Sequence, residues 1–342
     1  MRTSIAAANA TGLLAGVLLD RLLGDPRRLH PVAGFGQAAA ALERRGYAPT
    51  RAAGARHVAI AVGVPVAAAA LAQFATRNRP LARAALTAVA TWAVLGGTSL
   101  RREAVTLADA LAVGDLPAAR AKLPSLCGRD PSNLGPDELA RATVESVAEN
   151  TSDAVVAPLC WGAVAGLPGL VGYRAVNTLD AMIGHRSARY ENFGWAAARL
   201  DDVANLFPAR LAAGLTVLVA GKGRRGPALR TWLRDGAKHP SPNAGQVEAA
   251  AAGALGLRLG GRNDYAGRVE VRPTLGDGAP PLPRDIYRAA RLSGAIGTAA
   301  LVATAGHALA APARRAVVSW LRARRRDAAG RSALVRRAGG GR

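Results

Sequence analysis

The sequence has few cysteines, few aromatic residues and few acidic residues. Two cysteines in 342 residues, Cys127 and Cys160, cannot form a disulfide framework or a cysteine-rich zinc site. Aromatic residues make up 4% of the chain and are scattered, so the aromatic platform of a soluble nucleic-acid-binding domain is absent. We find no P-loop, no Gly-x-Ser-x-Gly elbow, no His-Glu-x-x-His motif and no dinucleotide fingerprint. Any ATP site in this chain is therefore not of the P-loop kind.

Positive charge and apolar residues dominate instead. The chain carries 45 Lys and Arg against 23 Asp and Glu, a net charge of +22, while 50% of its residues are hydrophobic. Arginines gather at the ends of apolar stretches, as in Arg101-Arg102 and Arg314-Arg315. This arrangement is typical of charge that flanks membrane segments, and it argues against nucleic acid as a partner.

Five uncharged runs approach the roughly 20 residues that cross a bilayer core. They cover residues 3–19, 58–76, 84–100, 154–173 and 292–312. A sixth, residues 211–221, reaches full length only with residues 203–209 and a tolerated Arg210. We therefore predict an all-α fold, a multi-pass membrane bundle of about five or six apolar segments with polar helical loops. The alternative is a soluble alanine-rich helical protein, because alanine inflates every hydropathy average.

We expect residues 1–312 to form one membrane-embedded domain and residues 313–342 an arginine-rich, partly disordered tail. The positive-inside tendency places this tail in the cytoplasm, since it contains many arginines and only one acidic residue, Asp327. If the polar motifs below form one site, one apolar segment must be re-entrant or interfacial. Residues 154–173, interrupted by Pro158 and Pro168, are our candidate.

Four polar clusters adjoin the apolar segments. The first, residues 20–31, contains Asp25-Pro26 and His30-Pro31, which predict turns after the first helix because residues before proline avoid helical angles. Taken alone, an ordinary helix-exit loop explains it equally well.

The second cluster places Glu145, Glu149 and Asp153 at positions i, i+4 and i+8, on one helical face. No Lys or Arg lies between them, and like charges at this spacing destabilise a helix. We therefore expect a cation there, and Mg²⁺ takes such oxygen ligands and shares them with phosphates. A solvated acidic face is the alternative.

The third cluster, residues 174–205, mixes oxygen ligands with arginines. The oxygen ligands are Asn177, Asp180, Asp201, Asp202 and Asn205, and the arginines are Arg174, Arg186, Arg189 and Arg199. Such a mixture suits a metal–nucleotide site, in which arginines and Mg²⁺ share the phosphate charge. An interfacial loop of paired charges is the alternative.

The fourth cluster, residues 238–248, runs from Lys238-His239-Pro240-Ser241 to Glu248. We predict that Asn243 caps the helix that follows, whose free N–H groups would then form an anion site beside Lys238 and His239. A plain capping turn explains the same residues.

Together these segments resemble the CobD/CbiB family of cobalamin biosynthesis, the adenosylcobinamide-phosphate synthases. The matching stretches are residues 20–32, 145–159, 173–211 and 239–248, and their order extends the resemblance from about residue 12 to about residue 312. The resemblance implies a multi-pass cell-membrane ligase that joins aminopropanol, or its O-phosphate, to the propionate carboxylate of adenosylcobyric acid. Because a carboxylate does not condense with an amine in water, ATP and Mg²⁺ are the expected cofactors, with a corrinoid as substrate.

With this resemblance, the clusters acquire hypothetical roles. The metal ligands would be Glu145, Glu149, Asp153, Asp201 and Asp202. The catalytic residues would be His30, His239 and Asp180, histidine being a base that titrates near neutrality. Substrate and phosphate groups would be bound by Asp25, Arg174, Asn177, Arg186, Tyr190, Lys238, Ser241, Asn243 and Glu248. A homo-oligomer or a pathway partner is compatible with the sequence.

The main competing interpretation is a membrane transporter of corrinoids or another small molecule, because carboxylates near membrane segments also mark transport paths. A transporter would move its substrate across a vesicle without forming a bond. A purely structural scaffold would not need carboxylates aligned without counter-charges.

Overall fold

The computed structural model describes residues 2–25, 30–265 and 268–338. The elements, in chain order, are α1 (Arg2–Leu23), α2 (Pro31–Gly46), α3 (Arg51–Ala75), α4 (Pro80–Val94), α5 (Gly97–Ala112), α6 (Leu116–Lys122), η1 (Leu123–Ser125), α7 (Pro136–Thr151), η2 (Ser152–Val156), α8 (Ala157–Ala165), α9 (Leu167–Leu179), η3 (Asp180–Gly184), α10 (Tyr190–Phe193), α11 (Trp195–Val219), α12 (Arg225–Asp235), α13 (Ala244–Leu255), β1 (Leu259–Tyr265), β2 (Arg268–Leu275) and α14 (Pro283–Ala338). The turn η1 is a 3₁₀ helix, and η2 and η3 are π-helices.

Five helical stretches are long and apolar enough to cross a membrane, which confirms the predicted all-α membrane bundle. They are Ser4–Leu23, Arg51–Ala75, Pro80–Ala112, Trp195–Val219 and Pro283–Ala310. The third stretch is broken at Leu95-Gly96, where α4 gives way to α5. The Asp20 side chain accepts hydrogen bonds from the Thr98 N–H and hydroxyl. Asp20 thereby caps the N-terminus of α5, because Gly96, at the capping position, has no side chain.

The apolar residues 154–173 form the two short helices α8 and α9 instead of one span. They meet at Gly166, whose φ of 69° is in the left-handed region that glycine tolerates best. At about 1.5 Å per residue, neither helix is long enough to cross a bilayer core. The Gln73 side chain, near the end of α3, accepts a hydrogen bond from the Leu167 N–H at this turn.

Helices α1 and α4 pack closely because two glycines of α1 face two threonines of α4. Gly12 lies against Thr87 and Gly16 against Thr91, with no room for a methyl group at either glycine. Small residues four positions apart let membrane helices approach in this way. Because both contacts advance together along the chain, α1 and α4 run parallel.

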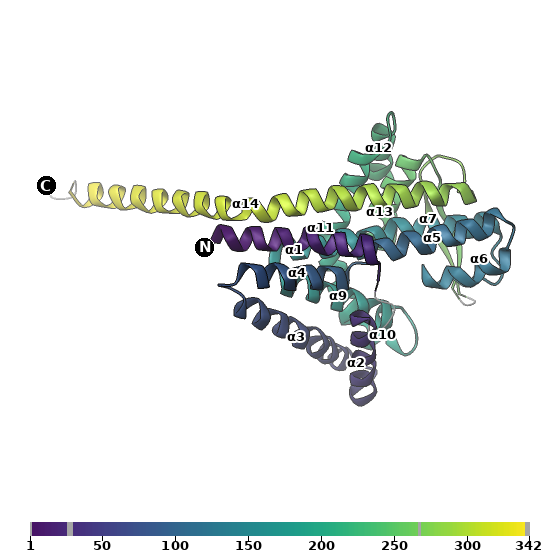
Figure 1. Ribbon diagram of the computed structural model, residues 1–342, viewed down its shortest axis with the longest axis horizontal. Helices are drawn as coiled ribbons and strands as arrows, with labels where there is room; N and C mark the ends of the chain where they lie inside the picture. The colour runs from purple at the N-terminus through teal and green to yellow at the C-terminus, as the bar shows by residue number, and fades with distance from the viewer. Residues whose placement is uncertain (1, 26–29, 266–267, 339–342) are drawn as a thin grey trace.

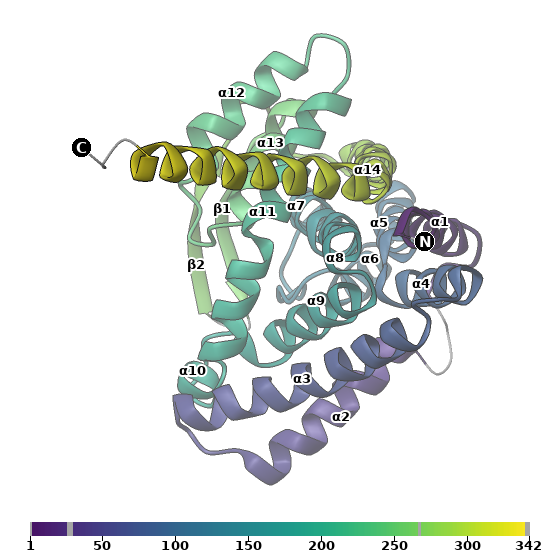
Figure 2. The ribbon, with the colours of Figure 1, turned by 90° about the vertical axis from the view of Figure 1, so that its left-hand side faces the viewer.

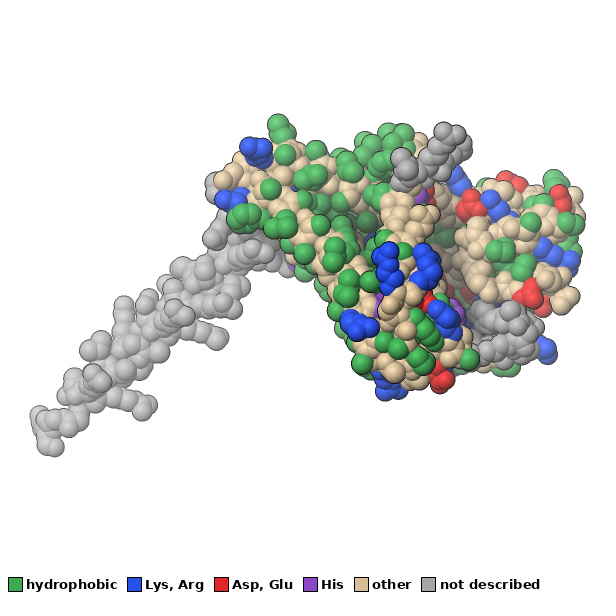
Figure 3. All heavy atoms as spheres, turned by 90° about the horizontal axis from the view of Figure 1, so that it is seen from below, with side chains coloured by type: hydrophobic (Ala, Val, Ile, Leu, Met, Phe, Trp, Pro, Cys, Tyr) green, Lys and Arg blue, Asp and Glu red, His purple; other side chains and the backbone are tan. Residues whose placement is uncertain are grey.

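The polar part of the chain lies at one end of this bundle (Figure 1), where α5, α6, α7, α12, α13 and the hairpin β1–β2 gather. We call this end the polar end. Hydrophobic side chains are spread over the surface of the bundle, whereas most acidic side chains visible in Figure 3 lie toward the polar end. The antiparallel hairpin, which pairs Arg262 with Val271, was not predicted from the sequence.

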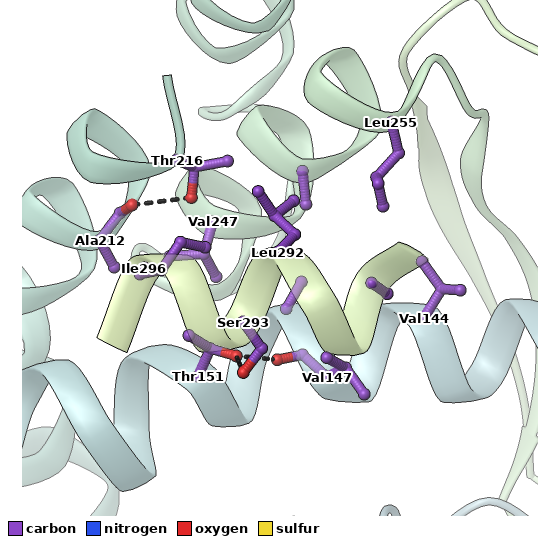
Figure 4. Close-up of a pocket in the computed structure, with 13 residues that line it drawn as sticks. Val144, Val147, Thr151, Ala212, Thr216, Val247, Leu255, Leu292, Ser293 and Ile296 are labelled. Atoms are coloured by element: carbon purple, nitrogen blue, oxygen red, sulfur yellow. Dashed lines mark hydrogen bonds between the residues drawn. The ribbon is translucent and has the colours of Figure 1, made fainter. Parts of the chain in front are cut away.

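Helices α7, α11, α13 and α14 meet in a well-packed junction (Figure 4). The gap between their side chains is about 10 Å³, at the lower limit of what holds one water molecule. Thr151 donates to the Ser293 hydroxyl at 2.7 Å, and Thr216 donates to the Ala212 carbonyl at 2.8 Å. This junction joins the elements around the candidate site but is too small to admit a substrate.

Candidate active site

Three of the four polar clusters meet around a cavity of about 280 Å³ between α7, η2, η3, α11 and the start of α13. Five carboxylates line it, namely Glu149, Asp153, Asp180, Asp201 and Asp202. Its other polar lining residues are Ser152, Asn205, Ser241 and Asn243, and no Lys or Arg is among the described residues that line it. We call this space the acid cavity.

Two π-helical turns place carboxylates in the acid cavity. Asp153 lies in η2, which links α7 to α8, and Asp180 begins η3 after α9. A π turn carries one more residue than an α turn and is rare in helices except at functional sites. Asp201 and Asp202 are consecutive residues of α11 on the opposite side of the cavity.

Side-chain amides orient the Asp201 carboxylate. Asn205 donates to its Oδ2 at 3.0 Å and Asn177 donates to its Oδ1 at 3.4 Å. The Tyr173 hydroxyl in turn donates to the Asn205 carbonyl oxygen at 2.9 Å, and Asn205 is fully enclosed. Asp201 therefore has a fixed position while still lining the cavity.

The clustered carboxylates hinder one another's ionisation. Burial, followed by the nearby charges of Asp201, Asp202 and Glu149, raises the pKa of Asp180 to about 7. Burial and the charges of Asp201, Glu149 and Asp180 also raise the pKa of Asp153 well above its usual value. A bound cation would relieve this repulsion.

Mg²⁺ fits the acid cavity by the chemistry of its donors. Among the described residues, no three His, Cys, Asp or Glu side chains already stand close enough to hold a metal directly. Mg²⁺ commonly keeps several waters and binds through one or two carboxylates and substrate phosphates, so a ready-made triad is not required. The all-oxygen lining and the excess negative charge suit a hydrated ion.

A second cavity of about 500 Å³ lies beside the first, where α1, α5, α7 and α9 come together. Its charged and polar lining residues are Asp25, Ser99, Arg102, Glu103, Ser125, Asn150 and Arg174. We call it the arginine cavity.

Arg174 lies between the two cavities. It donates to Asn177 at 3.5 Å, and Asn177 donates to Asp201. Its guanidinium is within electrostatic reach of Asp25 on one side and Asp153 on the other, and its Nε is buried without a hydrogen-bond partner. This group could bind an anionic part of a substrate that bridges the two cavities.

The first polar cluster reaches the arginine cavity through Asp25. The Asp25 N–H donates to the Ser99 hydroxyl at 3.3 Å. His30 lies next to it, with Nε2 3.9 Å from the Asp25 carboxylate, while its Nδ1 accepts from the Val32 N–H at the start of α2. His30 therefore adjoins the arginine cavity and not the acid cavity.

Three predicted residues are engaged in a buried network behind the acid cavity. Glu145 pairs with Arg129 and accepts a hydrogen bond from the Gly260 N–H of the hairpin. His239 faces Glu248 at 4.0 Å, both being buried. Burial, together with nearby Glu145 and Glu149, raises the pKa of Glu248 well above its usual value. These residues support the cavity wall but do not line it.

Three further predicted residues lie elsewhere. Lys238 pairs with Asp235 at 2.7 Å. The Tyr190 hydroxyl donates to Glu43 at 3.1 Å, and Arg186 is exposed on the loop before α10.

The prediction that the Asn243 side chain caps α13 is wrong. Asn243 occupies the capping position, but its amide donates to the Asp202 carbonyl oxygen at 2.8 Å instead. The Ser241 hydroxyl accepts from the N–H groups of Asn243 and Ala244 at 3.3 and 3.2 Å and takes over the capping role. The start of α13 is thereby fastened to α11 beside the acid cavity.

Three residues that line the cavities were not predicted, namely Ser152, Ser99 and Arg102. Ser152 is buried, lines the acid cavity and has a hydroxyl without a hydrogen-bond partner. Its place directly before Asp153 was the available signal. Arg102 was interpreted as membrane-flanking charge, because nothing in the sequence shows that it faces a cavity.

The pattern of the CobD/CbiB proteins matches residues 13–293, most of the chain. The chain belongs to the CobD/CbiB family. Similar members include the cobalamin biosynthesis protein CobD of Mycobacterium bovis, 55% identical over 306 residues that cover 88% of this chain and 96% of that protein. The proteins of the same name from Geobacter metallireducens and Chromobacterium violaceum are 47% and 45% identical, over 81% and 83% of this chain and 89% and 92% of their own. No solved structure matches the chain.

Proposed function

We propose that this CobD/CbiB protein is the membrane enzyme of cobalamin biosynthesis that joins aminopropanol, or aminopropanol O-phosphate, to the propionate carboxylate of adenosylcobyric acid at the expense of ATP. The family and its named relatives support a role in cobalamin biosynthesis. The observation that carries the finer proposal is the acid cavity beside the arginine cavity: five carboxylates line the acid cavity, and none of its described lining residues is Lys or Arg.

The two cavities divide the charges that such a reaction must handle. Asp153, Asp201 and Asp202 would hold Mg²⁺, which supplies charge neutralisation to the ATP phosphates. Arg174 and Arg102 would bind anionic groups of the substrates from the other side. The carboxylate and the phosphate to which it must couple are then brought together near Arg174.

Amide formation also needs a group that accepts a proton from the attacking ammonium. Asp180 lines the acid cavity, where its carboxylate could accept this proton. His30 adjoins the arginine cavity, whereas His239 faces Glu248 behind the acid cavity. Asp180 and His30 are therefore the better-placed candidates.

The direct test is an assay of protein purified in detergent or nanodiscs, supplied with adenosylcobyric acid, aminopropanol O-phosphate and Mg-ATP. The corrinoid mass and the nucleotide product are followed together. We expect an amide product formed in step with ATP consumption. Absence of product from a sample that still binds corrinoid would contradict the ligase.

The alternative of a corrinoid transporter predicts a different outcome in the same preparation. Protein reconstituted into sealed vesicles would then move corrinoid across the bilayer without any change in its mass. The assay in vesicles, with product analysis on both sides, separates the two functions.

A further inference from the structure

The contacts of α1 show in which direction the membrane helices run. Helices α1 and α4 are parallel, as the Gly16–Thr91 contact indicates. Helix α14 is antiparallel to α1, because Arg21 donates to Thr298 at 2.6 Å while Ala10 packs with Ala305 further along α14. The start of α1 and the part of α14 beyond Ala305 therefore lie at the same end of the bundle (Figure 1).

An even number of crossings follows from this arrangement. Helices α1, α3, α14 and the joined pair α4–α5 provide four crossings. The hairpin α8–α9 enters from the polar end, turns at Gly166 and returns, so it adds none. A fifth crossing by α11 would put the start of α14 at the wrong end.

Helix α11 in fact runs across the bundle. Figure 2 looks along the bundle and shows α1, α4 and the first part of α14 end-on. In the same view α11 is seen from its side, running between α10 and α12, and α3 is oblique. Both ends of α11 are thus near the polar end: Phe193, just before it, packs against the start of α3 at Gly54, and α12 follows it directly.

The two faces of α11 differ in chemistry. Asp201 and Asn205 face the acid cavity. The outer face is apolar and exposed, with Val203 63% and Phe207 66% exposed. The remaining large apolar side chains of this face are Trp195, Leu200, Leu206 and Leu218.

Two exposed arginines interrupt this apolar face, and both have polar partners in the protein. Arg199 lies 3.6 Å from the Asp202 carboxylate, and Arg210 donates to the Asn243 side chain at 3.4 Å and to the Pro242 carbonyl oxygen at 3.5 Å. If α11 spanned the bilayer, Arg210 and Asp202 would lie near its hydrocarbon centre, where charged side chains are costly. A helix with one exposed apolar face and one polar face is instead typical of the membrane interface.

We propose that α11 lies flat in the membrane interface on the side of the polar end, with its outer face in the lipid. The occupant of the apolar face is the bilayer itself, because α11 begins beside Gly54, at the end of α3 from which that helix enters the membrane. The helix that carries Asp201 and Asp202 is thereby seated on the membrane surface. This inference does not depend on the proposed reaction.

The test measures depth at three points along α11. Single-tryptophan variants keep Trp195, or carry Phe207→Trp or Leu218→Trp, with every other tryptophan changed to phenylalanine. At about 1.5 Å per residue these points extend over about 35 Å. Each variant is placed in nanodiscs of phospholipids brominated either near the headgroup or near the end of the acyl chain. Val64→Trp, on the exposed face of α3, is the matched control for a spanning helix.

We expect the three α11 positions to be quenched alike, and more strongly by bromine near the headgroup, whereas Val64→Trp is quenched more strongly by bromine near the chain end. Deep quenching at Phe207→Trp with shallow quenching at the two ends would show a spanning helix and overturn the proposal. Absence of quenching at all three would show a face covered by water or by a second copy, and would overturn it equally.

A second measurement covers the case in which loss of the tryptophans lowers the yield. Spin labels are attached at positions 195, 207 and 218 of a chain with Cys127 and Cys160 changed to alanine. Their collision rates with oxygen and with a water-soluble nickel complex give the same three depths. Equal, shallow depths are expected, and a deep middle position contradicts the interfacial helix.

Discussion

Asp201 and Asn205 stand one turn apart on α11, and the Asn205 amide donates to the Asp201 carboxylate at 3.0 Å. Because Asn205 also accepts from Tyr173, its amide cannot turn round, so its N–H side always faces Asp201. A rigid carboxylate that lines a cavity rich in negative charge is what a hydrated cation requires.

Replacing Asp201 by asparagine should therefore reduce activity while the protein still folds and assembles. We expect the Asp201→Asn variant to lose activity about 100-fold or more at a fixed Mg²⁺ concentration, since even supporting residues of metal sites cost 10- to 100-fold. Ligation rate is measured against Mg²⁺ concentration, with detergent gel filtration to check assembly. Glu191→Gln, which removes an exposed charge on α10, is the matched control. Full activity of Asp201→Asn would remove this residue from the metal site.

The α1–α4 contact makes a prediction about stability alone. A methyl group at Gly16 would lie 2.7 Å from the Ala88 carbonyl oxygen and 2.8 Å from Thr91 Cγ2. Gly16→Ala should therefore lower the free energy of unfolding by about 1–3 kcal/mol, the usual cost of overpacking. Thermal unfolding in detergent measures it. Gly63→Ala, on α3, has no atom within 4 Å of the added methyl and should leave the midpoint unchanged or slightly raised.

Helical periodicity correctly predicted some of the carboxylates that line the acid cavity. It failed for a carboxylate whose direction is set by a partner on another segment. Glu149 and Asp153 line the cavity as their shared face indicated, whereas Glu145 turns to Arg129 in the preceding loop. Spacing along one helix cannot reveal a partner on another segment. The π-helical turn η2 also shifts the face between Glu145 and Asp153, and no residue pattern announced it.

Hydropathy similarly predicted that α11 is apolar but not how it lies. An average over 18 or more residues combines the face with Phe207 and the face with Asp201 into one value. Only the packing of α11 against α13 and the acid cavity separates the two faces. The hairpin β1–β2 was not predicted because its strands are rich in polar residues, with Gly260 and Gly261 both at positive φ.

Asp235 gives a prediction about acid stability. Its carboxylate is 1% exposed and accepts from Arg234 and Lys238, each at 2.7 Å, and from the Gly276 N–H at 2.9 Å. The hydrogen bond with Arg234 is the largest cause that lowers the pKa of Asp235 below its usual value. A carboxylate with a lowered pKa in the folded state contributes stability above its unfolded pKa of about 4, and loses it as the pH falls toward the folded value.

We therefore expect Asp235→Asn to lower the free energy of unfolding by about 2 kcal/mol at neutral pH, the scale of hydrogen bonds to a charged group. The difference from the native chain should shrink as the pH falls below about 4. Chemical unfolding at a series of pH values checks both statements. Asp277→Asn is the control, since Asp277 also pairs with Arg234 but is 77% exposed. An equal loss in the two variants would contradict the role of burial.

The four-crossing arrangement predicts which loops share a side of the membrane. The turn between α3 and α4 lies at the opposite end of the bundle from the polar end (Figure 1). Asn78 is exposed in this turn, and Ser132 is exposed just before α7. Lys222, just after α11, should share the side of Ser132 if α11 lies in the interface, and the side of Asn78 if α11 crosses. Single cysteines at these positions, in a chain whose native cysteines are alanine, are labelled with an impermeant thiol reagent in inside-out and right-side-out vesicles.

We expect Lys222→Cys and Ser132→Cys to be labelled in the same vesicle type, and Asn78→Cys to be labelled in the other type. Labelling of Lys222→Cys together with Asn78→Cys would show that α11 crosses. The same experiment bears on the arginine-rich tail, whose charge alone predicts a cytoplasmic position. Because α14 leaves the bundle at the end where α1 begins, a reporter at the C-terminus should agree with Asn78. If ATP reaches the acid cavity from the cytoplasm, the Ser132 side is cytoplasmic and the tail lies across the membrane from it, contrary to the position that its arginines predict.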